Sequence, residues 1–305
     1  MEAVSTIGLY GKIPAERDFV RVNSGSFQRA GLDRWFQEGM EHLHGERTQL
    51  PGEPTNFLLF STDGPHPFVG VFAPGTDAVG RTFPVIVSMA LEKGSDRTAL
   101  SMIPMRLAPF LDAGAKLAVG TQGLAATQTA TQVATLAASA HPVPPDLDRD
   151  AFLSGTRLTE LRAALDSARD GTAYALTTVV AACSQAKASQ SNSPSRVLTL
   201  DCPAPSAGLQ IFWLELVLRH LNGEMPSLFW SQASGRLLIA LGPAPSLMLA
   251  YLANPDHKSS RRWPLHTLSQ TAHTNALEHL SPAQARVLAS EETSLAEVLI
   301  AFSEV

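Results

Sequence analysis

Gly8–Phe19, GLYGKIPAERDF, and a second stretch about seventy residues later, Asp77–Pro84, DAVGRTFP, decide how this chain is organised. In both stretches, turn-forming residues and charged residues gather at the end of an apolar run. Loops of this kind, held on a rigid scaffold, commonly carry function. We therefore expect the two loops to present backbone and charge to a partner.

The runs around these loops predict a sheet. Thr6–Tyr10 is typical of a strand that enters the first loop, and extended character resumes at Phe19–Val22. Three runs rich in Phe, Val and Ile follow, separated by turn residues: Phe57–Thr62, Pro67–Ala73 and Phe83–Leu91. Short strands joined by tight loops favour an antiparallel arrangement.

Helical patterns surround these strands. A single helix is predicted before Pro51, capped by Ser24 or Ser26, because apolar residues recur there at helical spacing: Leu32, Trp35, Phe36, Met40 and Leu43. Later helices are predicted over 103–117, 152–165, 173–188, 206–222, 246–252 (capped by Ser246), 282–290 and 295–302, and later strands over 196–201, 227–230 and 236–241. Within 173–188, residues 177–180 would equally suit a strand.

This order of elements predicts an α/β fold of the α+β type. Its central sheet is expected to be mixed and largely antiparallel, flanked by helices, with extra C-terminal helices. Residues 1–255 are predicted to form one domain, which contains a low-complexity helical excursion near 120–145 and a linker near 189–195. Residues 256–305 are predicted to form a helical C-terminal extension.

Composition limits the classes of function. The 305 residues are 45% hydrophobic and 17% charged, which is typical of a soluble globular protein. The net charge of -5 provides no basic field for nucleic acid, so we expect no nucleic-acid partner. Cys183 and Cys202 are expected to be reduced thiols in a cytoplasmic protein, and no apolar run is long enough for membrane insertion.

No set of residues points to a reaction. Nucleotide-binding glycine motifs and a nucleophile elbow are absent, so we expect no catalytic residue, no metal and no cofactor. His42 and His44 are two residues apart and do not share a helical face. The basic stretch His257–Pro264, HKSSRRWP, is open to three interpretations: a solvated patch, a contact with an acidic protein surface, or an anion site.

Five charged residues in the two opening stretches also have two interpretations. In the first, Asp18 caps a turn and pairs with Arg81 or Arg17 across adjacent loops. In the second, Lys12, Arg17, Asp18, Asp77 and Arg81 form a docking surface. The two interpretations are compatible, because a loop that binds a partner must itself be held in place.

The motifs together resemble the TagF (also ImpM) family of type VI secretion-associated proteins. Three segments carry the resemblance in order and spacing: Tyr10–Pro14 followed by Asp18-Phe19-Val20, Asp33–Gln37, and Val79–Pro84. The resemblance covers most of residues 5–255. Arg17 departs from the family pattern, which usually has Gly before the Asp; if that position requires a positive φ, the loop here must differ or carry strain.

The resemblance implies a cytoplasmic, non-enzymatic regulator that represses type VI secretion assembly after translation by binding a forkhead-associated-domain scaffold protein. The residues expected to form the partner-binding or structural motif are Tyr10, Gly11, Lys12, Pro14, Arg17, Asp18, Phe19, Trp35, Asp77, Gly80, Arg81, Phe83 and Pro84. Two alternatives stay open: a small hydrolase or phosphatase-like enzyme that uses Asp18 and Asp77, and a generic dimerising scaffold protein.

Overall fold

A computed structural model describes residues 6–60, 66–91, 97–139, 148–189, 196–221, 225–231, 233–267 and 269–303. Within these residues, nine strands form one sheet in the order β2-β1-β5-β4-β3-β7-β8-β6-β9. Every strand pair is antiparallel except β6 and β9. The strands are β1 Gly8–Gly11, β2 Val20–Val22, β3 Thr55–Leu59, β4 Phe68–Ala73, β5 Val85–Ala90, β6 Thr199–Pro203, β7 Ser227–Ser231, β8 Arg236–Ala240 and β9 Arg262–Pro264.

The helices fall into two groups along the chain. The N-terminal group is α1 Gly25–Arg29, α2 Leu32–Gly45, α3 Arg97–Leu100, α4 Ile103–Arg106, α5 Ala108–Gly120, the 3₁₀ turn η1 Thr121–Gly123, and α6 Ala126–Ser139. The C-terminal group is α7 Arg149–Gly155, α8 Leu158–Ala164, α9 Arg169–Ser189, α10 Ala207–His220, α11 Met248–Ala253, α12 Gln270–Glu278, α13 Pro282–Val287 and α14 Leu295–Ser303.

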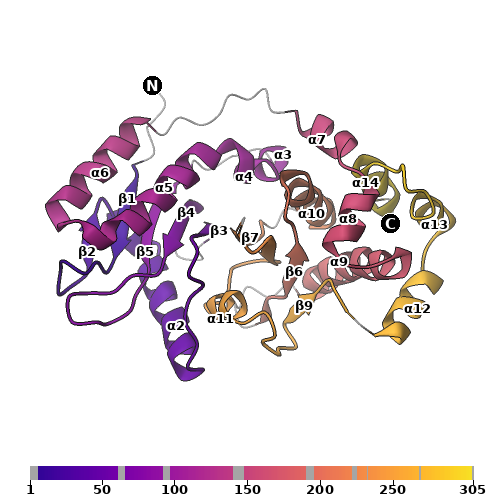
Figure 1. Cartoon of the computed structure of the whole chain (residues 1–305). Helices are drawn as coiled ribbons and strands as arrows, with labels where there is room; N and C mark the ends of the chain where they lie inside the picture. Colours follow the sequence, from indigo (N-terminus) through magenta and orange to yellow (C-terminus); the bar gives the residue numbers. More distant parts are fainter. Residues whose placement is uncertain are drawn as a thin grey trace.

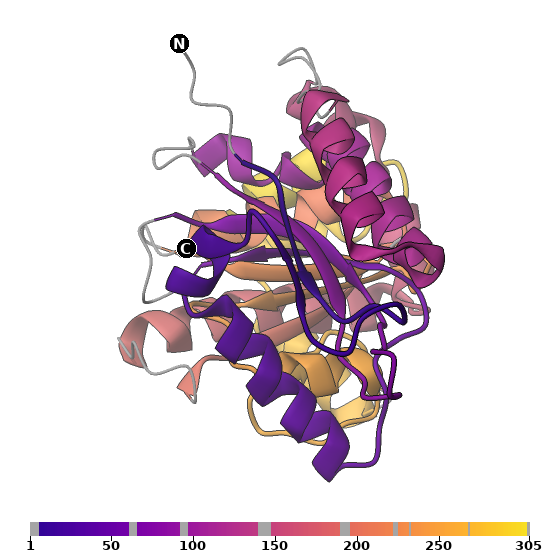
Figure 2. The same cartoon turned by 90° about the vertical axis from the view of Figure 1, so that its left-hand side faces the viewer.

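The central strands are apolar on both faces, so the sheet needs helices on both sides. Along a strand, successive side chains point to opposite faces. Phe57, Phe72 and Phe229 accordingly belong to the core beneath α2 and α11, whereas their neighbours Leu58 and Val71 belong to the core on the other face, which α5 and α10 share. Figures 1 and 2 show the sheet between these two helical layers. The predicted α+β class, with a mixed and largely antiparallel sheet flanked by helices, is confirmed.

The predicted helix capped by Ser24 or Ser26 is two helices. Gly31 adopts φ 70°, a left-handed conformation that ends α1 and starts α2 in a new direction. Ser24 is the residue before α1, but its side chain caps no backbone N–H. The prediction that Ser246 caps the short helix over 246–252 is also wrong, because the helix found there, α11, starts after Leu247.

The segment after residue 255 contributes more than helices. Arg262–Pro264 forms β9, which pairs parallel to β6, and Gln270–Glu278 forms α12; the sequence patterns predicted neither element. The expected helices near the C-terminus are present as α13 and α14. The division at residue 255 stays a prediction. The predicted linker lies almost wholly outside the described residues.

The Ala/Thr/Gln-rich stretch forms helix α6 over residues 126–139. Hydroxyl groups of Thr129, Thr131 and Thr135 donate to carbonyls four residues earlier, so these polar side chains are satisfied within the helix. Residues 140–145 of the predicted excursion lie outside the described part of the chain.

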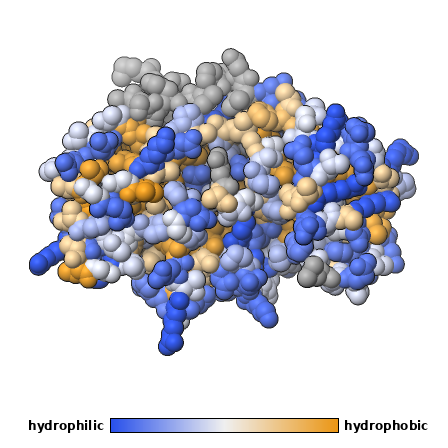
Figure 3. All heavy atoms as spheres, in the orientation of Figure 1, coloured by the Kyte–Doolittle hydropathy of each residue, from blue (hydrophilic) through white to orange (hydrophobic). Residues whose placement is uncertain are grey.

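Two broader features match the composition. Cys183 and Cys202 are buried free thiols. In the part of the chain that the structure describes, no helix has both the length and the apolar character that crossing a membrane requires. On the face seen in Figure 3, hydrophobic residues are interspersed with hydrophilic ones.

Candidate functional site

The two stretches singled out from the sequence meet at one end of the sheet and form what we call the charged corner, residues Lys12–Asp18 and Asp77–Arg81 (Figure 1). The first loop follows β1, and the second lies between β4 and β5. The amide of Ala78 donates to the carbonyl of Glu16 at 2.8 Å, and a guanidinium nitrogen of Arg81 donates to the carbonyl of Arg17. Backbone and side-chain bonds therefore fasten one loop to the other.

Asp77 is the centre of the charged corner, and its side chain is fully buried. Its Oδ1 accepts hydrogen bonds from the amides of Val79, at 3.0 Å, and Arg81, at 2.9 Å. Its Oδ2 lies 2.6 Å from Nε of Arg81 and 3.1 Å from Nζ of Lys12. One carboxylate thus shapes its own loop and ties that loop to the end of β1.

These contacts keep Asp77 ionised. Burial disfavours its charged form, but hydrogen bonds from the amide of Arg81, the ammonium of Lys12 and the guanidinium of Arg81 outweigh that effect, helped by the amide of Val79. Together they hold the pKa of this carboxyl well below its usual range.

Glycines make the close approach at the corner possible. A Cβ on Gly11 would lie 2.3 Å from the carbonyl oxygen of Pro84, so only glycine fits where the end of β1 lies against the residue before β5. Gly80 adopts φ 85°, which lets its loop turn back within five residues. Arg17 needs no such freedom: among the described residues, the non-glycine positions with positive φ are Asn23, Arg47 and Asp166. The strain considered for Arg17 is therefore absent.

An aromatic cluster packs against the charged corner. The rings of Tyr10 and Phe19 stack with centroids 5.0 Å apart, and the edge of Phe83 meets Phe19 at 4.9 Å. Nζ of Lys12 lies 5.3 Å from the centre of the Phe19 ring, within the range of a cation–π contact. Burial raises the pKa of Tyr10. The predicted motif residues Tyr10, Phe19 and Phe83 thus give the loops a packed base, which buried Pro84 continues.

The outer surface of the corner combines cations with an apolar tip. Arg17 and Asp18 are exposed, Val79 is 60% exposed, and the side chain of Arg81 is 60% exposed although its Nε is bound to Asp77. Pro14 is half-buried beside them. The buried carboxylate of the corner is paired within the protein, whereas Arg17, Asp18 and Val79 are exposed to solvent.

Two predicted motif residues make contacts outside the ion pairs of the corner. The interpretation that pairs Asp18 with Arg81 or Arg17 is wrong, because Asp77 binds Arg81, and Asp18 Oδ1 accepts from the amide of Phe19 at 2.7 Å. Trp35 lies away from the corner. Its Nε1 donates to the carbonyl of Ala244 at 2.7 Å and its ring stacks on Phe229, so it joins α2 to the C-terminal half.

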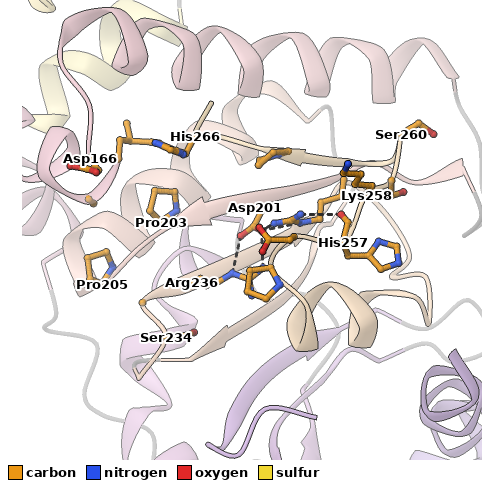
Figure 4. A pocket seen from close by; sticks show the side chains of 18 residues that line it. Asp166, Asp201, Pro203, Pro205, Ser234, Arg236, His257, Lys258, Ser260 and His266 are labelled. Carbon is orange, nitrogen blue, oxygen red and sulfur yellow. Dashed lines mark hydrogen bonds and ion pairs between the residues drawn. The ribbon is translucent and has the colours of Figure 1, made fainter. Parts of the chain in front are cut away.

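A second ionic cluster, which sequence reasoning missed, lies at a cavity of about 1060 Å³ beside β6 and β9 (Figure 4). Asp201, on β6, receives Nη2 of Arg236 at 2.7 Å and Nε of Arg262 at 3.0 Å. Arg236 also donates to the carbonyl of Tyr251 at 3.0 Å. An aspartate inside an otherwise apolar strand pattern was the available signal, since a buried carboxylate requires a partner.

The basic stretch His257–Pro264 is therefore only partly solvated. Arg262 turns inward to Asp201 and donates to the carbonyl of His257 at 3.1 Å, and Nε2 of His257 lies 2.9 Å from Glu46 on the chain segment that ends α2. Lys258 stays exposed at the edge of the cavity. This stretch fastens the C-terminal strand to the rest of the molecule.

The carboxylates considered for hydrolysis do not converge. Both oxygens of Asp77 are occupied by donors, and Asp18 points to its own neighbour in the chain. Within the described residues, no group of three or more His, Cys, Asp or Glu side chains is arranged to hold a metal ion. The corner is thus held by internal hydrogen bonds and ion pairs, and its two aspartates do not form a catalytic pair.

A comparison with known protein families gives a match to the N-terminal part of the chain. Residues 8–138 match the family described as "TagF N-terminal domain, Type VI secretion system-associated". This part of the chain is thus similar to type VI secretion system-associated proteins. Through these residues, which include the whole charged corner, the chain is similar to the TagF family.

The chain was also compared with curated proteins and with solved structures. A search of curated proteins gives no match to this chain. Among solved structures, the chain is similar to PA0076 from Pseudomonas aeruginosa PAO1, with 18% sequence identity and a TM-score of 0.49; the match covers 85% of this chain and 98% of that chain.

Proposed function

We propose that this protein is a cytoplasmic, non-enzymatic regulator that represses type VI secretion assembly by binding a forkhead-associated-domain scaffold protein through the charged corner. The TagF match supports the link to the secretion system. The main support for this binding surface is the arrangement of charges at the corner. Asp77 is buried and paired with Lys12 and Arg81, whereas Arg17, Val79 and Arg81 have exposed side chains.

A rigid rim of this composition suits protein recognition. Its loops are already held by the bonds from Ala78 to Glu16 and from Arg81 to Arg17, so little conformational entropy is lost on binding. The exposed apolar side chain of Val79 can supply an anchor, and Arg17 and Arg81 can supply complementarity to an acidic surface.

The test is capture of the purified scaffold protein by this protein carrying Arg17→Glu and Val79→Ser. These side chains are exposed, and the fold uses only the backbone carbonyl of Arg17, so the variant should keep its circular dichroism spectrum and Tm. We expect scaffold affinity to fall by roughly tenfold or more, because a desolvated contact and an attractive charge are lost together.

The matched control is Arg286→Glu, an exposed arginine on α13 at the far end of the molecule (Figure 1). It makes the same charge change away from the corner. A folded corner variant that captures the scaffold as well as the control does would contradict the proposed binding surface.

A further inference from the structure

A groove of about 700 Å³ lies next to the charged corner, between the end of α2 and the loop that joins β4 to β5. Met40, Leu50 and Phe83 contribute apolar lining, and His44 and Arg47 contribute basic groups. Nε2 of His44 lies 3.1 Å from Oγ1 of Thr82, so the helix end and the loop are in direct contact across this groove.

The ionisable side chains that line the groove are all basic. Among the described residues that line it, none is an aspartate or a glutamate. Two acids adjoin lining residues in sequence: Glu53 follows Gly52, and Glu46 precedes Arg47 and lies 2.9 Å from Nε2 of His257. Asp77 is buried between Lys12 and Arg81. The groove therefore offers an apolar floor with basic groups that no lining carboxylate neutralises.

Arg47 occupies a position where glycine is the usual residue. It follows the C-cap of α2 with φ 55°, its amide donates to the carbonyl of His44 at 3.1 Å, and the amide of Thr48 donates to Leu43 at 2.9 Å. These two bonds define a Schellman motif, whose left-handed residue is commonly Gly. An arginine there adopts a disfavoured backbone conformation, and outliers of this kind cluster at functional sites.

We propose that this groove binds a short acidic segment of a partner protein, with one apolar side chain of the segment on the groove floor and its carboxylates at Arg47 and His44. Charge complementarity selects this occupant, because the lining is basic and apolar. The inference rests on the proposed function, since the groove adjoins the corner through Thr76 and Thr82 and would extend the same partner surface.

The first variant to test is Arg47→Gly, which separates binding from folding. Glycine is the residue that the Schellman motif favours, so the Tm of this variant should be no lower than that of the wild type. The second is Gly52→Glu, which adds a negative charge at the groove. A Cβ there meets no atom within 4 Å, so the fold should tolerate it. Gly155→Glu, equally open and on α7, is the matched control.

The probe is a fluorescein-labelled peptide of alternating Glu and Leu, measured by fluorescence anisotropy on the full chain. We expect binding that weakens with salt, and a loss of roughly tenfold or more with Arg47→Gly, with Gly52→Glu, or with a peptide that has Gln in place of Glu. The control should bind as the wild type does. Absence of binding by the wild type, or equal binding by all variants, would overturn the inference.

Scaffold capture separates this inference from the proposed function. If Arg47→Gly retains full scaffold affinity whereas the Arg17→Glu, Val79→Ser variant loses it, the groove is not part of that interface and the proposed function stands. If the peptide result holds while neither variant affects scaffold capture, the groove stands as an acidic-segment site and the proposed binding surface fails.

Discussion

Asp77 and Asp201 each hold two cationic side chains, but the two clusters are built differently. Asp77 binds Arg81, four residues away, and Arg81 keeps a side chain that is 60% exposed. Asp201 binds Arg236 and Arg262, which are 35 and 61 residues away, and the side chain of Arg262 is only 9% exposed. The first cluster shapes a loop and ties it to Lys12 at the end of β1 while one of its cations stays mostly exposed, whereas the second joins three strands inside the fold.

The comparison implies unequal contributions to stability. A buried charge that loses its partner is strongly destabilising, because its desolvation is no longer compensated. An exposed arginine that loses its partner regains water. Substitutions in the Asp201 cluster should therefore lower the stability of the folded protein more than substitutions in the Asp77 cluster.

Asp201→Ala should have the largest effect. It leaves the mostly buried guanidinium groups of Arg236 and Arg262 without their carboxylate, and we expect the free energy of unfolding to fall by about 3 kcal/mol in urea titrations. Asp256→Ala, an exposed carboxylate at the same cavity, should change it by no more than about 0.5 kcal/mol. Equal effects of the two variants would show that the Asp201 cluster is solvated.

Asp77→Asn should have a smaller effect that depends on pH. The amide oxygen of Asn can still accept from the amides of Val79 and Arg81, but the attraction to Lys12 is lost. Since the folded-state pKa of Asp77 is depressed, its contribution is fully present above the unfolded pKa of about 3.9 and is lost as pH falls toward the folded-state pKa.

The measurement for Asp77 is the Tm of wild type and variant in buffers from pH 7 to pH 3. The wild type should be the more stable at pH 7, and the gap should narrow as the buffer is acidified below about pH 4. A gap that stays constant or widens on acidification would contradict the proposed ionised state.

Arg81→Met should have the smallest effect. Its side chain is mostly exposed and Asp77 keeps Lys12 and two amide donors, so we expect a change within about 0.5 kcal/mol in the free energy of unfolding. Arg262→Met, measured in parallel, should cost distinctly more. If the two arginines prove equivalent, burial does not explain the difference between the clusters.

The same contrast explains what could be predicted from the sequence. The Asp77 loop is short and rich in turn residues, and the loop Lys12–Asp18 carries part of the motif that resembles the TagF family. Both loops are therefore recognisable in the sequence. The strands were found because Phe, Val and Ile runs are long enough to show their pattern. The interpretation that pairs Asp18 with Arg81 or Arg17 fails because spacing alone does not distinguish two nearby carboxylates.

Other features depend on contacts that a linear pattern does not contain. β9 consists of Arg262, Trp263 and Pro264, residues that read as a basic surface stretch until Asp201 lies opposite them. The break between α1 and α2 depends on the left-handed backbone of Gly31, while the apolar spacing continues on both sides of it. The groove at Arg47 is formed by segments that the sequence keeps far apart.

The two edges of the sheet limit how this protein can associate. An open edge strand offers unpaired backbone groups to any extended chain, which favours strand addition and aggregation. Here both edges are short: β2 spans Val20–Val22 and presents exposed Arg21, and β9 spans Arg262–Pro264, whose final residue has no N–H. Lengthwise pairing with another copy or with a peptide strand is thereby discouraged.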